Sequence, residues 1–194
     1  ERRGYQYHTY LREHFVGLKM SVTPTIAGGH GLLAAEARYR SQFGGDFQIP
    51  SRSFGEHKRA EYALRTQWRR PLATRIGTIS PSLSLSFDAE PHEQSSWTPR
   101  VDLSWSLLLG ISINAGWGKS FRRAPLSSLF WKADYYTIGN PNLKPERATE
   151  WDVGGRLRRG PFILDSRYFE RVVEDIIVWD RRGPDHRFQP VNLP

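Results

Sequence analysis

Six residues between positions 122 and 136 have side chains that suit an anionic, partly planar chelate. Three are cationic and three are aromatic: Arg122, Arg123, Trp131, Lys132, Tyr135 and Tyr136. Guanidinium groups attract anions and stack on flat groups, and aromatic rings stack in the same way. These six residues are the candidate ligand contacts. The simpler alternative, that the segment only packs on neighbouring loops, stays open.

No residue pattern points to catalysis or to metal binding. The chain has no cysteine, and its six histidines lie far apart without zinc-ligand spacing. No pair of carboxylates has the spacing of an acid–base pair, and the G-x-S-x-G motif of hydrolases is absent. The sequence therefore predicts no enzyme, no metal site and no cofactor.

The charge of the chain is strongly basic, at +8 with a pI near 10.0 over 194 residues. Nucleic-acid-binding proteins usually gather such charge on one helix or patch. Here the arginines are spread through strand ends and loops, so we expect no nucleic-acid partner. Solvation of strand ends and loops is the first explanation of this charge, and contact with lipid phosphates or with an anionic ligand is the alternative. The chain has no run of about 18 apolar residues, so the sequence predicts no membrane-spanning helix.

Apolar and polar residues alternate through most of the chain, which is typical of β-strands. Candidate strands cover residues 14–25, 31–40, 57–69, 72–89, 97–108, 110–119, 147–158 and 161–178, with another beginning near Arg187. A slip in the alternation between Ile76 and Ile79 is interpreted as a β-bulge. We expect the apolar set on a convex face: Leu83, Leu85, Phe87, Leu103, Trp105, Ile111, Ile113, Trp151 and Val153. We expect the polar set on a concave face: Ser84, Ser86, Ser104, Asn114, Asp152 and Arg156.

The joins between these strands are alternately short and long. Short joins lie at residues 26–30, 70–71, 109–110 and 159–160, and longer joins at 41–56, 90–96, 120–146 and 179–186. Barrels of the outer membrane have tight periplasmic turns and long extracellular loops. The sequence therefore predicts an all-β fold, an antiparallel up-and-down meander that forms a partial arc of a transmembrane β-barrel.

Two motifs lie between the strands that end near residue 119 and begin near residue 147. The first is Phe121-Arg122-x-x-Pro125-Leu126-x-x-Leu129-Phe130, and the second is Gly139-Asn140-Pro141-Asn142-Leu143-Lys144-Pro145-Glu146. Gly-Asn favours a turn, and each proline fixes φ and removes a donor. Together they resemble the C-terminal barrel half of TonB-dependent outer-membrane receptors. The stretch Tyr168-Phe169-Glu170-x-x-x-x-Asp175-Ile176 resembles the strand that follows in that family.

The resemblance implies an outer-membrane receptor of Gram-negative type that takes up a small-molecule chelate, such as a ferric siderophore or cobalamin. It implies that residues 1–194 are a single barrel segment lacking a signal peptide, plug domain and further strands. The TonB complex would act through that plug region, and outer-membrane lipid would surround the wall. The motif residues are implied to be architectural.

The segment 120–146 is expected to face outside the cell, with exposed charges that contribute little to folding. Two alternatives stay open: a soluble antiparallel β-sandwich that binds polyanions or sugars, and an outer-membrane barrel enzyme.

Overall fold

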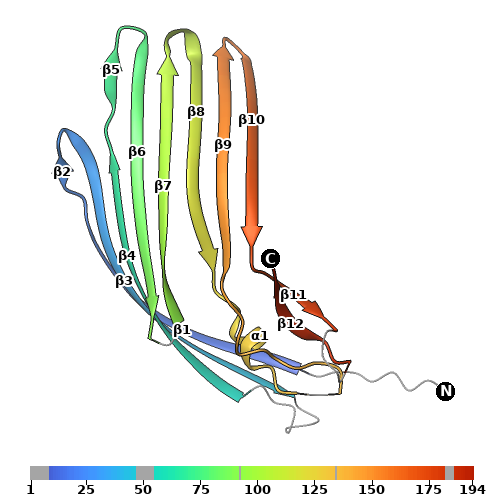
Figure 1. Cartoon of the computed structure of the whole chain (residues 1–194). Helices are drawn as coiled ribbons and strands as arrows, with labels where there is room; N and C mark the ends of the chain where they lie inside the picture. Colours follow the sequence, from blue (N-terminus) through green and yellow to red (C-terminus); the bar gives the residue numbers. More distant parts are fainter. Residues whose placement is uncertain (1–8, 47–54, 92, 134, 182–185) are drawn as a thin grey trace.

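The computed structural model describes residues 9–46, 55–91, 93–133, 135–181 and 186–194. In this part of the chain, ten strands form one curved antiparallel sheet, which is open between β1 and β10 (Figure 1). The strands of the sheet are β1 (Thr9–Val22), β2 (Thr25–Ile26), β3 (Gly29–Asp46), β4 (Gly55–Arg69), β5 (Leu72–Thr74), β6 (Gly77–Glu90), β7 (Glu93–Leu107), β8 (Ile111–Arg122), β9 (Glu146–Arg159) and β10 (Phe162–Glu174).

Each long strand pairs with its neighbour in sequence, in the order β1-β3-β4-β6-β7-β8-β9-β10. The predicted meander is therefore confirmed. A separate hairpin contains β11 (Ile176–Asp180) and β12 (Gln189–Leu193), and one short helix, α1 (Leu126–Phe130), lies between β8 and β9. The described residues do not form the two stacked sheets of a β-sandwich, so that alternative is wrong.

The two faces of the sheet have opposite chemistry, as the alternation predicts. Residues directly opposite in paired strands share a face, and the register pairs Leu103 with Ala115 and Ala115 with Val153. By the same pairing, Ser104 lies opposite Asn114 on the other face. All nine apolar residues predicted to share a face do so, and all six polar residues share the other.

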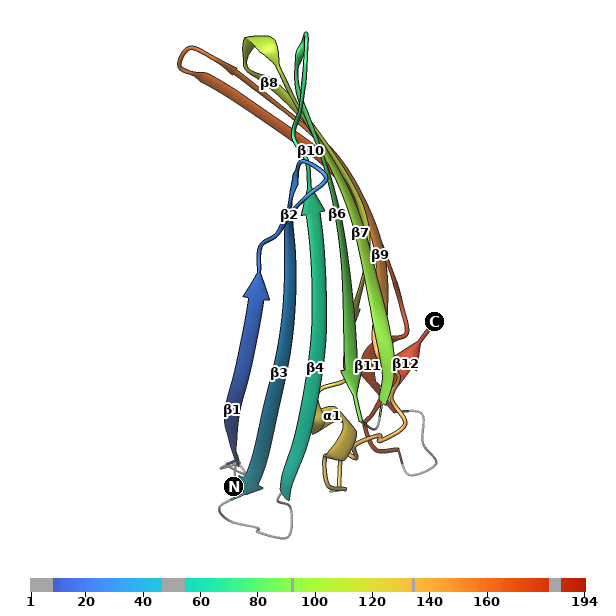
Figure 2. The ribbon, with the colours of Figure 1, turned by 90° about the vertical axis from the view of Figure 1, so that its left-hand side faces the viewer.

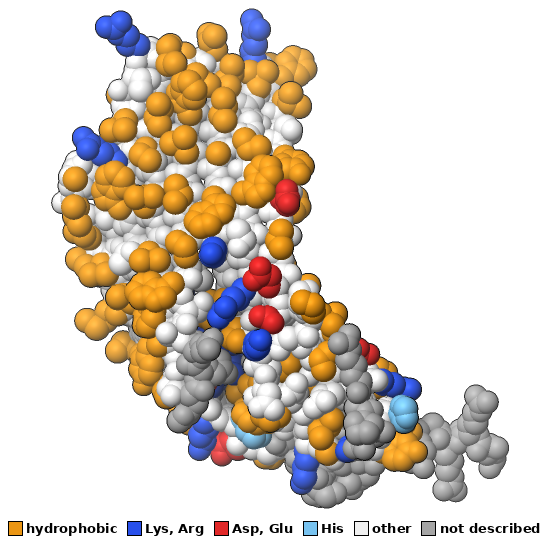
Figure 3. Space-filling view, viewed as in Figure 1, with side chains coloured by type: hydrophobic (Ala, Val, Ile, Leu, Met, Phe, Trp, Pro, Cys, Tyr) orange, Lys and Arg blue, Asp and Glu red, His pale blue; other side chains and the backbone are white. Residues whose placement is uncertain are grey.

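The apolar face is the exposed one. Leu18 and Met20 are 67% and 69% exposed, whereas Ser80 and Ser82 on the polar face are only 8% and 9% exposed. The sheet is bowed, with α1 on its concave side (Figure 2), and apolar side chains cover much of the upper part of the molecule in Figure 3. Apolar side chains outside and polar side chains inside are the arrangement of a wall between lipid and a wet lumen.

The predicted turn at Arg70–Pro71 is wrong. Pro71 cannot donate to the ladder, so pairing is interrupted there, but the chain keeps its direction and Arg70 N donates to Pro81 O at 3.2 Å. β5 then continues beside β6, and the chain reverses between Thr74 and Gly77. The slip that was interpreted as a bulge is this turn.

Other strand boundaries differ from prediction as well. β6 ends at Glu90 and β7 begins at Glu93, so the join predicted at 90–96 is short and the alternation of joins fails there. Phe87 and Trp97 are the last apolar pair of these two strands. The residues that pair beyond them are polar, so the alternation of apolar and polar residues does not reveal that the strands continue. The strand predicted over 161–178 is split at Asp175, whose φ of 55° turns the chain out of the sheet into β11.

Candidate ligand-binding surface

The segment between β8 and β9 lies at the end of the sheet opposite the short turns (Figure 1). It begins with Arg123, forms α1 and returns to the sheet at Glu146. Within α1, the side chains of Leu126 and Leu129 are buried against Ala124, with Leu143 and Ile177 packed beside them. The sequence did not predict this helix, because five residues are too few to show a helical period.

A buried group of three charged side chains fixes the start of this segment to the concave face. Arg59 Nη1 donates to the carbonyl oxygen of Ala124 at 3.1 Å. Glu90 lies between two arginines, 3.2 Å from Arg59 Nε and 3.3 Å from Arg123 Nε. The three side chains are 4%, 9% and 10% exposed. The expectation that Arg123 is exposed is therefore wrong, and its contribution to folding stays a prediction.

Arg122, the second residue of the first motif, forms an ion pair with Glu146, the last residue of the second motif. Arg122 donates to both oxygens of Glu146, at 2.6 and 2.8 Å, and Ile177 N donates to Glu146 Oε1 at 2.9 Å. The Arg122 hydrogen bonds lower the pKa of the Glu146 carboxyl below its ordinary value, and burial opposes them. Glu146 is the first residue of β9, and the first large apolar residue of that strand on the apolar face is Trp151. This pair joins β8, β9 and β11.

The second motif is held by residues of β12. Asn140 Nδ2 donates to Pro190 O at 2.9 Å, and Asn142 N donates to Asn140 Oδ1 at 3.0 Å. Asn192 Oδ1 accepts from Lys144 N at 2.8 Å, and its Nδ2 donates to Lys144 O at 3.0 Å. Sequence reasoning missed Asn192, whose role depends on a partner 48 residues away.

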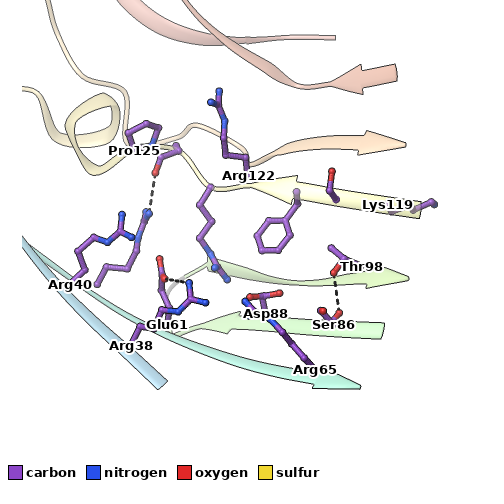
Figure 4. Close-up of a pocket in the computed structure, with 15 residues that line it drawn as sticks. Arg38, Arg40, Glu61, Arg65, Ser86, Asp88, Thr98, Lys119, Arg122 and Pro125 are labelled. Atoms are coloured by element: carbon purple, nitrogen blue, oxygen red, sulfur yellow. Dashed lines mark hydrogen bonds and ion pairs between the residues drawn. The ribbon is translucent and has the colours of Figure 1, made fainter. Parts of the chain in front are cut away.

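A hollow of about 540 Å³ opens on the concave face beside this segment (Figure 4). Its lining comes from β3, β4, β6, β7, β8 and the start of the α1 segment. The lining residues are Arg38, Arg40, Arg59, Glu61, Arg65, Ser86, Asp88, Thr98, Lys119, Ser120, Phe121, Arg122, Arg123, Ala124 and Pro125. Lysine and arginine therefore outnumber acidic residues in the lining.

Several carboxylates that orient these arginines lie outside the lining. Glu36 accepts two hydrogen bonds from Arg38, at 2.6 and 2.8 Å, and also lies 3.3 Å from Arg65. Glu13 lies 3.0 Å from Arg40. Each guanidinium has five N–H donors in a rigid plane, so one carboxylate leaves donors for another acceptor. The hollow can therefore present fixed guanidinium donors to an anion.

Of the six candidate contacts, Arg122 and Arg123 line this hollow. The Arg122 guanidinium points away from the other labelled side chains (Figure 4), toward its partner Glu146. Trp131, Lys132, Tyr135 and Tyr136 are not lining residues, and the two tyrosines are 79% and 56% exposed. The structure thus divides the predicted set into a part at the hollow and a part on the surface of the segment.

Sequence reasoning missed the arginines on β3 and β4 that line the hollow. Arg38 and Arg40 have the period-two spacing of one strand face, and Arg59 and Arg65 share a face of β4. That spacing was the available signal. Within the residues that the structure covers, no group of three or more histidine or acidic side chains could hold a metal ion. No helix in those residues is long and apolar enough to cross a membrane.

Comparisons with known proteins agree with this geometry. Residues 2–194 match the family described as TonB dependent receptor-like, beta-barrel. The vitamin B12 transporter BtuB of Vibrio vulnificus (strain YJ016) is 33% identical over 97 residues, which are 46% of this chain and 15% of that protein.

Two solved structures have the same fold. The siderophore receptor PirA from Pseudomonas aeruginosa has a TM-score of 0.73 at 20% identity, over 95% of this chain and 34% of that one. A double mutant of the Serratia marcescens hemophore receptor HasR, solved with its hemophore HasA and heme, has a TM-score of 0.72 at 14% identity. That match covers 95% of this chain and 37% of HasR. The chain thus spans about a third of these solved relatives.

Proposed function

This chain belongs to the TonB-dependent receptor β-barrel family, and we propose that it forms part of the wall of a receptor for an anionic chelate. The family consists of transporters rather than enzymes, and its barrels reside in the Gram-negative outer membrane. The predicted enzyme alternative is therefore wrong. Residues 1–194 act as one barrel segment in this proposal.

The observation that carries the proposal is the guanidinium-lined hollow on the concave face. Arg38, Arg40 and Arg65 project from neighbouring strands, and carboxylates orient their planes. Arginine suits planar, delocalised anions because its donors form a rigid fork. A ferric siderophore with several anionic oxygens has this chemistry. Lys132, Trp131, Tyr135 and Tyr136 supply further contacts as the cargo approaches from outside the cell.

Transport by such a receptor involves more than the barrel wall. The TonB complex acts through a plug region of the complete receptor, and the barrel segment provides wall, lumen surface and extracellular segments. Cobalamin is the second candidate cargo, because the relative at 33% identity is a vitamin B12 transporter. Cobalamin lacks the multiple anionic oxygens of a ferric siderophore. Binding of the two candidate cargoes should therefore differ in how strongly it depends on the arginines of the hollow.

Equilibrium binding to the complete receptor in detergent tests the proposal. The probes are a ferric catecholate chelate and cobalamin. In the double variant R40Q/R65Q, binding of the ferric chelate should weaken about tenfold or more, since hydrogen bonds to charged groups contribute about 1.5–3 kcal/mol each. The loss should shrink as salt rises.

Arg156→Gln is the matched control. Arg156 lies on the same face and pairs with Asp165 at 2.6 Å, but it is not a lining residue. The control should bind like the wild type. Equal affinity in R40Q/R65Q and wild type at low salt would contradict the proposal, and tight binding of cobalamin alone would favour the second candidate.

A further inference from the structure

The four turns at the end of the sheet opposite α1 together contain four arginines and no acidic residue. The turn segments are residues 23–28, 70–76, 108–110 and 158–161, and their charged residues are Arg70, Arg75, Arg158 and Arg159. All four are exposed. In Figure 3 the end with the short turns shows Lys and Arg side chains without Asp or Glu beside them. The opposite end of the sheet holds carboxylates such as Glu56, which makes the two ends unlike.

Neighbouring turns touch one another, so the arginines belong to one continuous edge. A Cβ on Gly28 would lie 3.5 Å from Arg70 Nε, which places that guanidinium beside the first turn. Leu108 N donates to Ile76 O at 3.2 Å, which joins the next two turns. A Cβ on Gly110 would lie 2.1 Å from Arg158 O, which places the third turn against β9. We call this edge the short-turn rim.

Apolar side chains lie among the arginines of the short-turn rim. Ile26 and Ile76 are 55% and 52% exposed, and Leu108 and Leu109 are 62% and 86% exposed. Exposed apolar side chains next to cations are typical of segments at the head-group level of a bilayer. The rim also continues directly from the apolar face of the sheet. Its position therefore matches the boundary between acyl chains and head groups.

The arginines of the short-turn rim are available to an external anion. Within the described residues, no carboxylate forms an ion pair with Arg70, Arg75, Arg158 or Arg159. Arg70 lies beside the turn at residues 23–28, and Arg158 and Arg159 lie at the turn at residues 158–161. Positive charge therefore recurs along the short-turn rim. A row of unpaired guanidiniums attracts phosphate groups by charge and by paired N–H donors.

We propose that the short-turn rim binds the phosphate head groups of anionic phospholipids in the periplasmic leaflet. The short turns of outer-membrane barrels lie on the periplasmic side. The proposal is independent of the cargo, because the rim lies at the far end of the sheet from the guanidinium-lined hollow. Its failure would leave the proposed uptake function untouched, and cargo affinity measured in parallel distinguishes the two.

The test is lipid binding to the complete receptor in an uncharged detergent, with phosphatidylglycerol and phosphatidylcholine as probes and native mass spectrometry as the readout. The wild type should prefer phosphatidylglycerol. In the variant R70Q/R75Q/R158Q/R159Q, phosphatidylglycerol affinity should fall about fivefold for each arginine at low salt. Phosphatidylcholine binding and cargo affinity should not change. The matched control makes the same charge change elsewhere: R12Q/K58Q/K144Q/R171Q.

A second measurement on the wild type does not depend on how the variant folds. Arginine-selective dicarbonyl labelling, mapped by mass spectrometry, should be slowed at the four rim positions by phosphatidylglycerol and not by phosphatidylcholine. Loss of lipid preference to the same degree in the rim and control variants would overturn the proposal. So would a wild type without lipid preference, or rim arginines that label equally fast with either lipid.

Discussion

Replacing Glu90 by glutamine should release the start of the α1 segment from the concave face. Glu90 accepts a hydrogen bond from Arg59 and forms an ion pair with Arg123, and all three side chains are at most 10% exposed. The change keeps the shape of the side chain but removes its charge. Two guanidiniums then remain buried without the carboxylate that lies between them.

The expected cost follows from this burial. Removing one partner of a buried ion pair typically costs about 3–5 kcal/mol, and the low exposure leaves little solvent to screen the loss. At about 1.4 kcal/mol per factor of ten, the lower value corresponds to roughly 100-fold more frequent opening of the segment. The carboxamide can still accept a hydrogen bond, so we expect a value near the lower end.

Pulse proteolysis of the complete receptor in detergent measures this opening through cleavage within residues 123–145. Glu13→Gln is the matched control, because Glu13 also pairs with an arginine, Arg40, at 3.0 Å, but is 41% exposed. An exposed pair contributes about 0–1 kcal/mol, so the control should resemble the wild type. If E90Q is cleaved no faster than E13Q, the buried group does not anchor the segment and the reasoning is refuted.

Three further predictions concern the apolar face, one turn and the contacts of Glu146. Trp105→Arg, on the apolar face, should cost about 2–4 kcal/mol if the site lies near the bilayer midplane, and heat-modifiability on a gel should show less folded barrel. A fully folded variant would argue against lipid exposure there. Gly77→Ala should cost at least about 1–2 kcal/mol, because its φ is 143° and the new Cβ would lie 2.0 Å from Ser106 O. Gly155→Ala, with its nearest atom at 3.8 Å, is the control, and equal urea midpoints would contradict the prediction. The pKa of the Glu146 carboxyl is lowered from 4.5, mainly by the hydrogen bond from Arg122. The stability that the hydrogen bonds of Glu146 to Arg122 and Ile177 provide is therefore present above pH 4.5, and it is lost as the pH falls through the pKa of Glu146 in the folded protein. The protection of the Ile177 amide from hydrogen exchange should stay constant from neutral pH to about pH 5 and should decrease at lower pH. If the protection already decreases near neutral pH, protonation of Glu146 is not the cause.

The faces of the sheet could be predicted from sequence because a strand has a period of two. Leu103 and Ser104 must point to opposite faces whatever the register, so the alternation alone assigned them. The turn after β5 could not be placed in this way. The Arg70–Pro71 pair reads as a turn, whereas the real reversal is fixed by the positive φ of Gly77 and its contact with Ser106.

The candidate site was only partly predictable for a different reason. Arg122 and Arg123 were found because they are cationic residues of the long join at 120–146. Arg38 and Arg65 meet at Glu36 only when β3 and β4 pair in the observed register, and no local pattern contains that register. The burial of Arg123 likewise depends on Glu90, which belongs to a strand distant in sequence.

The central claim is that one face of this wall meets lipid and the other holds an anionic cargo against fixed arginines. A cryo-electron microscopy structure of the complete receptor with a ferric catecholate chelate tests it most directly. The account predicts density for the chelate on the concave face, in contact with Arg38, Arg40 and Arg65, and lipid density along the apolar face. Cargo density remote from these arginines, or a packed protein core against the apolar face, would contradict it.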